Sequence, residues 1–184
     1  MRLSTASDRD ENRAIDVLHA AFDAGIVAVD TANAYCRDDT EIGHNERLLA
    51  RALKTWRGDP ATIRVATKGG LTRPHGQWIP DGRARSLIAA CQASLRALDV
   101  SRIPLYQLHA PDPRVPFATS VRALDALKSR PHRCDRSLQR DGHPDTAAEA
   151  SCLVSISRSS TVRTRPDLRS AGAGNRCQGL ASCS

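Results

Sequence analysis

The feature that most constrains the fold is a regular alternation of short apolar runs with amphipathic helical patterns. Apolar residues recur three and four positions apart in the first helical pattern, as at Ile15, Leu18 and Phe22. The predicted helices span residues 10–24, 41–56, 83–98 and 116–129, with Asp81 as the cap of the third, and the predicted buried strands span 26–32, 63–68 and 103–109. Strands that alternate with helices indicate βαβ units around a parallel sheet.

Two nucleotide-binding versions of such a sheet are disfavoured by the sequence. No G-x-G-x-x-G follows a predicted strand, and no G-x-x-x-x-G-K-[ST] is present. A flavodoxin-like sheet and part of a (β/α)8 barrel both remain compatible with the pattern. The length of 184 residues is short of the ~250 residues typical of a complete barrel.

The composition changes abruptly near Arg130. All six aromatic residues and all three lysines precede this point, whereas residues 131–184 contain 9 Ser, 8 Arg and 4 of the 6 Cys. Leu, Ile, Val and Phe make up 7 of these 54 residues, which is below the ~20% expected of a folding chain. We therefore expect residues 1–130 to carry the fold and residues 131–184 to be disordered.

Several classes of protein are excluded by the same sequence. No apolar run reaches the ~18 residues of a membrane span, and the N-terminus lacks the apolar region of a secretory signal. The cysteines form no C-x-x-C, so neither a disulfide framework nor a metal site is predicted, and a reducing, cytoplasmic setting is expected.

A nucleic-acid partner is not expected either. The net charge of +7 would permit one, but the positive charge after Arg130 is sparse and interrupted by acidic residues. No stacking aromatics and no nucleic-acid-binding motif accompany it.

Chemically capable side chains stand at the ends of all three predicted strands. Asp30, Lys68 and His109 end the successive strands, and Tyr35 follows Asp30 in the next loop. Each residue alone has an ordinary structural explanation as a turn, cap, packing or solvated residue. In a barrel, however, the carboxyl ends of the strands converge on one catalytic face, so the repeated placement favours a shared site.

The four side chains make a coherent set for carbonyl chemistry. Lys68 beside Asp30 would form an ion pair, and its ammonium near the Tyr35 hydroxyl would make that hydroxyl a better proton donor. His109 could orient a carbonyl oxygen by a hydrogen bond. The loop at 71–82, with His75 and Trp78, either lines this pocket or is an exposed turn, and the sequence does not separate the two.

The motifs around these residues resemble the aldo-keto reductase family. The resemblance lies in A-F-D-A-G-I-V-A-V-D-T-A-N-A-Y (21–35), G-H-N-E (43–46), V-A-T-K-G-G (65–70) and S-L-R-A-L-D-V-S-R-I-P-L-Y-Q-L-H-A-P-D-P (94–113). It implies a (β/α)8 TIM barrel, NADP(H) as cofactor, and reversible reduction of an aldehyde or ketone to an alcohol. It also implies a catalytic tetrad of Asp30, Tyr35, Lys68 and His109, with Asp30 close to the nicotinamide ribose.

The resemblance covers only about residues 9–128 and stops at Arg130. The family's strand before the first helix, its later G-x-S-N strand and its later cofactor-binding groups have no counterpart here. We interpret the chain as a truncated, partial barrel and hypothesise that the segment after Arg130 is translated out of frame, with a natural tail as the alternative. The sequence therefore leaves two functions open, an NADP(H)-dependent reductase acting on a small-molecule carbonyl substrate and a non-catalytic half-barrel. Substrate identity, cofactor preference and oligomeric state are not predicted.

Overall fold

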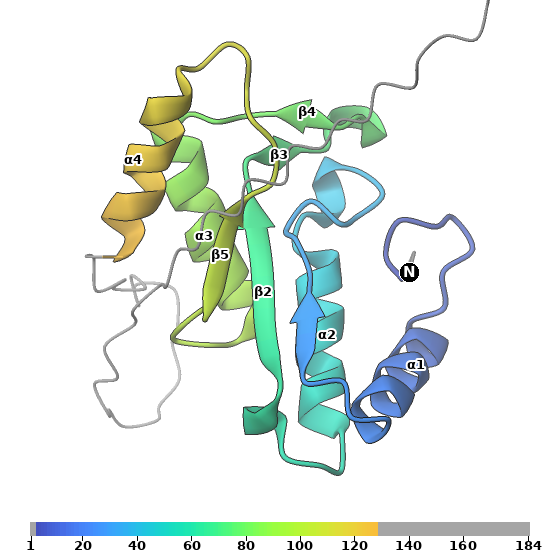
Figure 1. The fold of residues 1–184 in the computed structure, drawn as a ribbon. Coiled ribbons are helices and arrows are strands. Elements are labelled where there is room, and N and C mark those ends of the chain that lie inside the picture. Colours follow the sequence, from blue (N-terminus) through green and yellow to red (C-terminus); the bar gives the residue numbers. More distant parts are fainter. Residues whose placement is uncertain (1–2, 129–184) are drawn as a thin grey trace, which may run out of the picture.

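The computed structural model describes residues 3–128, which form a three-stranded parallel sheet covered by helices (Figure 1). The helices are α1 (Glu11–Asp23), α2 (His44–Thr55), α3 (Ala84–Leu98) and α4 (Phe117–Lys128). The strands are β1 (Ala28–Asp30), β2 (Arg64–Gly69), β3 (Leu71–Thr72), β4 (Ile79–Pro80) and β5 (Leu105–Leu108). Three short 3₁₀ turns lie at Asp39–Glu41, Pro60–Thr62 and Pro74–Gly76.

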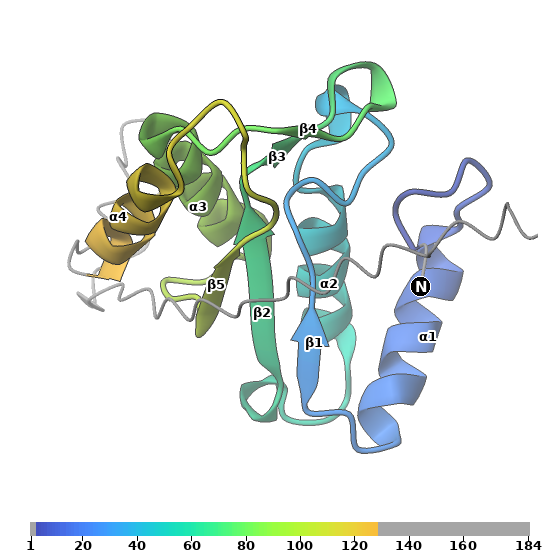
Figure 2. The same cartoon turned by 45° about the horizontal axis from the view of Figure 1, so that its top comes forward.

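The sheet has the order β1-β2-β5, so strands that follow one another through successive helices are also neighbours in space. Both pairings are parallel, with Asp30 opposite Ala66 and Lys68 opposite Gln107. The connecting helices α2 and α3 pack against each other on the same face of the sheet (Figures 1 and 2). Sequential strand order with helices on one face is the arrangement of a (β/α)8 barrel and differs from a doubly wound sheet. The partial-barrel prediction is confirmed for the described residues.

The core lies between the helices and the covered face of the sheet. Its fully buried members come from every layer: Leu48, Leu87, Ile103, Tyr106, Leu124 and Leu127. One polar pair is buried among them, because the Thr67 hydroxyl donates a 2.6 Å hydrogen bond to Glu46. Burial raises the pKa of the Glu46 carboxyl.

The first strand is shorter and more exposed than the sequence predicts. Ile26 and Val27 are 48% and 56% exposed and precede the strand, and Ala28 and Asp30 are also exposed. The prediction of a buried strand over 26–32 was wrong because β1 is an edge strand of the described sheet. In a complete barrel, a further strand would pair with this open edge.

The second predicted helix begins later than expected. Gly43 has a φ of +81°, which L-residues rarely adopt, and it separates the 3₁₀ turn Asp39–Glu41 from α2. The Glu41 carboxylate is held between Arg9 and Arg37, at 2.7 Å and 2.6 Å, and this pairing lowers its pKa. The turn therefore belongs to the loop that follows β1.

Asp81 does not cap the third helix as predicted. The N-cap position is Arg83, whose φ of −64° and ψ of 140° are extended, and its side chain makes no capping hydrogen bond. The Asp81 carboxylate instead accepts hydrogen bonds from the Arg83 side chain, at 2.5 Å and 2.8 Å, and from the Ser86 hydroxyl. These contacts lower the pKa of Asp81.

The loop predicted at 71–82 contains a small hairpin. β3 and β4 pair antiparallel, with Leu71 opposite Pro80 and Thr72 opposite Ile79. Two residues per strand give too little alternation for a sequence pattern to reveal, so the hairpin was missed.

Other sequence predictions concern the whole chain. None of the helices between residues 3 and 128 combines the length and apolar character that a membrane span requires. Within that range Cys36 and Cys91 are both fully buried. The expectation of disorder for residues 131–184 lies outside the described residues.

Candidate active site

The parallel sheet brings the predicted residues to one edge. Asp30 is the last residue of β1, Lys68 is near the end of β2, and His109 directly follows β5. Backbone hydrogen bonds from Thr31 to Ala66 and from His109 to Gly69, both 2.8 Å, continue the ladder past the assigned strands. The carboxyl ends of all three strands thus lie together, beside the β3–β4 hairpin (Figure 2).

The Lys68 ammonium joins the other groups of the site. Its Nζ donates to Asp30 Oδ2 at 2.5 Å and to Tyr35 Oη at 3.0 Å. It also donates to the Thr31 carbonyl oxygen at 3.1 Å. The Lys68 side chain is 14% exposed and that of Asp30 is 56% exposed, so the charge pair stands at the boundary between the sheet and solvent. The predicted ion pair and the predicted approach of Lys68 to Tyr35 are both present.

Tyr35 and His109 face each other across the site. Their ring centroids are 5.4 Å apart, with the planes nearly perpendicular at 86°. Burial lowers the pKa of His109 to about 4. The positive charge of Lys68 also lowers this pKa, whereas the negative charge of Asp30 raises it. The imidazole is therefore neutral near pH 7 and carries one N–H. His109 Nδ1 is buried and has no hydrogen-bond partner among the described residues.

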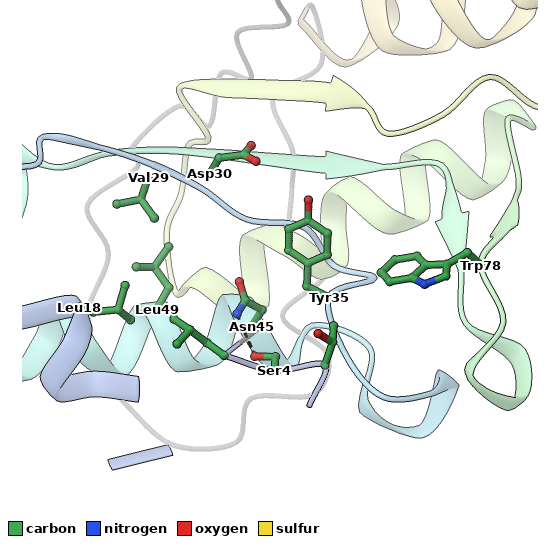
Figure 3. A pocket seen from close by; sticks show the side chains of 10 residues that line it. Ser4, Leu18, Val29, Asp30, Tyr35, Asn45, Leu49 and Trp78 are labelled. Atoms are coloured by element: carbon green, nitrogen blue, oxygen red, sulfur yellow. Dashed lines mark hydrogen bonds between the residues drawn. The ribbon is translucent and has the colours of Figure 1, made fainter. Parts of the chain in front are cut away.

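A cavity of about 340 Å³ opens beside Asp30 and Tyr35 (Figure 3). Trp78 lines it, and in Figure 3 the Tyr35 ring lies between Asp30 and the indole. The Trp78 centroid is 6.3 Å from Tyr35 and 6.1 Å from His109. Of the two residues that the sequence could not assign, Trp78 lines the site, whereas His75 lies at the hairpin turn with a φ of +50° and is not part of the cavity.

The N-terminal segment forms the opposite side of this cavity. Leu3, Ser4 and Thr5 contribute to its lining. Ser4 is 1% exposed and accepts a 2.8 Å hydrogen bond from Asn45, whose Oδ1 accepts one of 2.7 Å from Thr31. No motif marks this network in the sequence, because Asn45 lies 41 positions from Ser4 and 14 positions from Thr31.

Arg73 is a further residue near the site that the sequence did not predict. Its guanidinium lies 3.7 Å from the centroid of the Trp78 ring and donates a 2.8 Å hydrogen bond to the Arg37 carbonyl oxygen. An arginine after a Leu-Thr pair carries no motif that would identify this role.

The Asp30 carboxylate can accept a hydrogen bond in addition to the one from Lys68. Asp30 Oδ2 accepts a hydrogen bond from Lys68 Nζ. The carboxylate is more than half exposed, so it can also accept a hydrogen bond from a ribose hydroxyl. Residues 3–128 contain no cluster of His, Cys, Asp and Glu able to hold a metal ion.

The sequence is similar to known proteins over most of its length. The model of the aldo/keto reductase family matches residues 1–130. The aldo-keto reductase YhdN of Bacillus subtilis is 31% identical over 118 residues, which cover 64% of this chain and 34% of that protein. An uncharacterized oxidoreductase of Schizosaccharomyces pombe is 34% identical over 121 residues, covering 65% and 37%.

Solved structures show the same partial coverage. The holo form of the aldo-keto reductase AKR11C1 from Bacillus halodurans aligns with a TM-score of 0.56 at 32% identity, covering 69% of this chain and 39% of that one. The glycerol dehydrogenase AKR11B4 from Gluconobacter oxydans gives a TM-score of 0.57 at 31% identity, covering 68% and 38%. The chain thus spans a little over a third of the length of these relatives.

Proposed function

The chain belongs to the aldo/keto reductase family, and from this premise we propose that its site performs the reversible, NADP(H)-dependent reduction of an aldehyde or ketone to an alcohol. The observation that carries the proposal is the position of Lys68 Nζ, 3.0 Å from Tyr35 Oη and 2.5 Å from Asp30. Family membership supports oxidoreductase chemistry in general, and this geometry supports the specific assignment of roles.

Tyr35 is the proton donor in this proposal. A positive charge beside a phenol stabilises the phenolate that remains after the proton has left, so Lys68 assists the transfer to the carbonyl oxygen. Asp30 in turn holds the ammonium in place. NADPH, when bound with its nicotinamide ribose near Asp30, would supply the hydride that the carbonyl carbon accepts.

His109 has a different role because its imidazole is neutral near pH 7. A neutral ring does not compete with Tyr35 as an acid, but its N–H can donate a hydrogen bond to the carbonyl oxygen and orient it. The ring faces Tyr35 at 5.4 Å, so both groups can reach one oxygen atom.

The test is an assay in which nitrobenzaldehyde is the substrate and the oxidation of NADPH is monitored by absorbance. We expect Tyr35→Phe to reduce kcat about 10²- to 10⁴-fold, the usual contribution of a general acid. Tyr106→Phe is the matched control, because Tyr106 is the other tyrosine of the chain and is buried in the core away from the cavity. A rate unchanged by Tyr35→Phe would contradict the proposed mechanism.

The alternative is a non-catalytic half-barrel. It is favoured by the exposure of Asp30, which lies on an edge strand of the described sheet. In that case calorimetric titration with NADPH gives no heat of binding. Stoichiometric NADPH binding would exclude this alternative.

A further inference from the structure

Arg73 and Trp78 face each other across the base of the β3–β4 hairpin. Arg73 directly follows β3 and Trp78 directly precedes β4, so the paired strands bring the first and last residues of the loop together. The guanidinium carbon lies 3.7 Å from the centroid of the Trp78 ring, well inside the ~6 Å range of a cation–π interaction.

The Arg73 guanidinium is buried, and two of its three nitrogen atoms have no hydrogen-bond partner among the described residues. Arg73 is 6% exposed, and its Nε and Nη1 have no hydrogen-bond partner among the described residues. The buried Cys36 thiol adjoins it, but burial raises the pKa of that thiol to about 11, so the thiol stays neutral and supplies no counter-charge. The Trp78 ring is therefore a main partner of the cation.

Arg73 also connects the hairpin to the loop that carries Tyr35. Its Nη2 donates a 2.8 Å hydrogen bond to the carbonyl oxygen of Arg37, two residues after Tyr35. The Arg73 side chain thus donates a hydrogen bond to the loop that carries Tyr35, and its guanidinium lies over the Trp78 ring.

The Trp78 side chain is 48% exposed, so the protein interior alone does not fix the orientation of its ring. Its ring lies in edge-to-face arrangements with Tyr35 and His109, at interplanar angles of 78° and 64°. A half-exposed indole retains rotamer freedom, which contact with a fixed guanidinium removes.

We propose that Arg73 is a positioning residue that holds the Trp78 indole as a flat wall of the substrate pocket and thereby selects carbonyl substrates that carry an aromatic ring. The inference rests on the proposed function for its substrate class. Arg73 touches no reacting atom and acts through Trp78. A planar substrate group gains most from the wall, since aromatic pairs attract beyond the area they bury.

The first experiment reads the position of Trp78 without any activity. The chain has two tryptophans, so Trp56→Phe leaves Trp78 as the only indole. In this background we expect Arg73→Met and Arg73→Lys to speed the anisotropy decay of Trp78 and to increase its quenching by acrylamide. Arg85→Met is the matched control, because Arg85 is an exposed arginine in α3. Unchanged decay and quenching in a folded Arg73→Met protein would overturn the proposal.

The second experiment measures specificity as the ratio of kcat/KM for benzaldehyde to that for propanal. Arg73→Met should lower this ratio about 2- to 30-fold, mainly by raising the KM for benzaldehyde, which corresponds to the usual range of a cation–π interaction. An unchanged ratio in an active enzyme would overturn the substrate assignment. A wild-type protein without any NADPH oxidation contradicts the proposed function instead, and the fluorescence result then decides the role of Arg73.

Circular dichroism establishes that each variant is folded. Where Arg73→Met does not fold, Arg73→Lys decides the question, because it keeps the charge and the chain length but removes the flat face. A Lys variant with wild-type Trp78 fluorescence would contradict the stacking role.

Discussion

Lys68 is the residue that connects the end of β2 to the end of β1 and to the loop that carries Tyr35. Its ammonium contacts groups from the end of β1 and from the following loop, and the approach to Tyr35 Oη is 3.0 Å. The side chain is 14% exposed, so these contacts form in a partly desolvated environment where charge interactions are stronger than in water.

His109 gives a pH-dependent prediction at the residue scale. Its pKa is about 4 in the folded chain and near 6.5 in the unfolded chain, because burial disfavours the charged ring. Between these two pH values the unfolded state therefore binds more protons than the folded state. The contribution of His109 to the free energy of unfolding is fully present above pH 6.5 and is lost as the pH falls through 4.

We expect this loss to be on the order of 2 kcal/mol after allowance for solvent screening. The measurement is urea unfolding of wild type and His109→Asn from pH 7 to pH 4. The wild type should lose stability more steeply over this range than the variant. Equal slopes would show that His109 is not buried as a neutral ring.

At the scale of the elements, backbone conformation explains where the helices begin and end. Asp10 caps α1 by accepting hydrogen bonds from the backbone N–H groups of Asn12 and Arg13, at 2.9 Å and 3.1 Å. The C-cap of α3 is Asp99, in the left-handed region with a φ of +54°. Glycine adopts this conformation at least cost, so Asp99 is a strained end to α3.

Replacing this residue gives a prediction for α3. Asp99→Gly should raise the free energy of unfolding by about 0.5–1 kcal/mol, because the strain of a Cβ at positive φ is removed. Asp125→Gly, inside α4, is the matched control and should lower it by a similar amount, since glycine weakens a helix interior. Chemical denaturation measures both. A loss of stability in Asp99→Gly would contradict the account of the cap.

At the scale of the whole molecule, the described residues form one packed unit from α1 to α4. Phe22 of α1 packs on Trp56 after α2, with ring centroids 5.2 Å apart. Leu124 of α4 is fully buried, and α4 packs on α3. We propose that residues 1–130 are the folding unit, because the core extends to the last turn of α4.

Two changes test this proposal. Leu124→Ala should lower the free energy of unfolding by about 2–5 kcal/mol, the cost of emptying a buried leucine site. Phe117→Ala in the same helix is the control and should cost less, because Phe117 is 52% exposed. A chain ending at Arg130 should unfold with the same free energy as the full chain. A large difference would show that residues 131–184 contribute to the folded unit.

The sequence predicted most of the elements and the proximity of the candidate site residues, for reasons visible in particular residues. Periodic leucines marked the helices, and β-branched runs marked the strands within a few residues. Asp30, Lys68 and His109 could be grouped in advance because parallel strands must bring their carboxyl ends to one edge. Errors arose where one residue decided the outcome, as at Gly43, which delays α2, and at Asp81, which binds the Arg83 side chain.

The sequence by itself determined the alternation of elements, the family resemblance, the three residues at the strand ends and Tyr35 in the loop after the first strand. The tertiary structure decided that the helices cover a single face of the sheet, that β1 is exposed, and that Trp78 lines the cavity with Arg73 stacked against it. The division follows from the range of the interactions. Periodicity and backbone geometry act between neighbours along the chain, whereas the stacking of Arg73 on Trp78 and its hydrogen bond to the Arg37 carbonyl exist only once the hairpin and the Tyr35 loop have met.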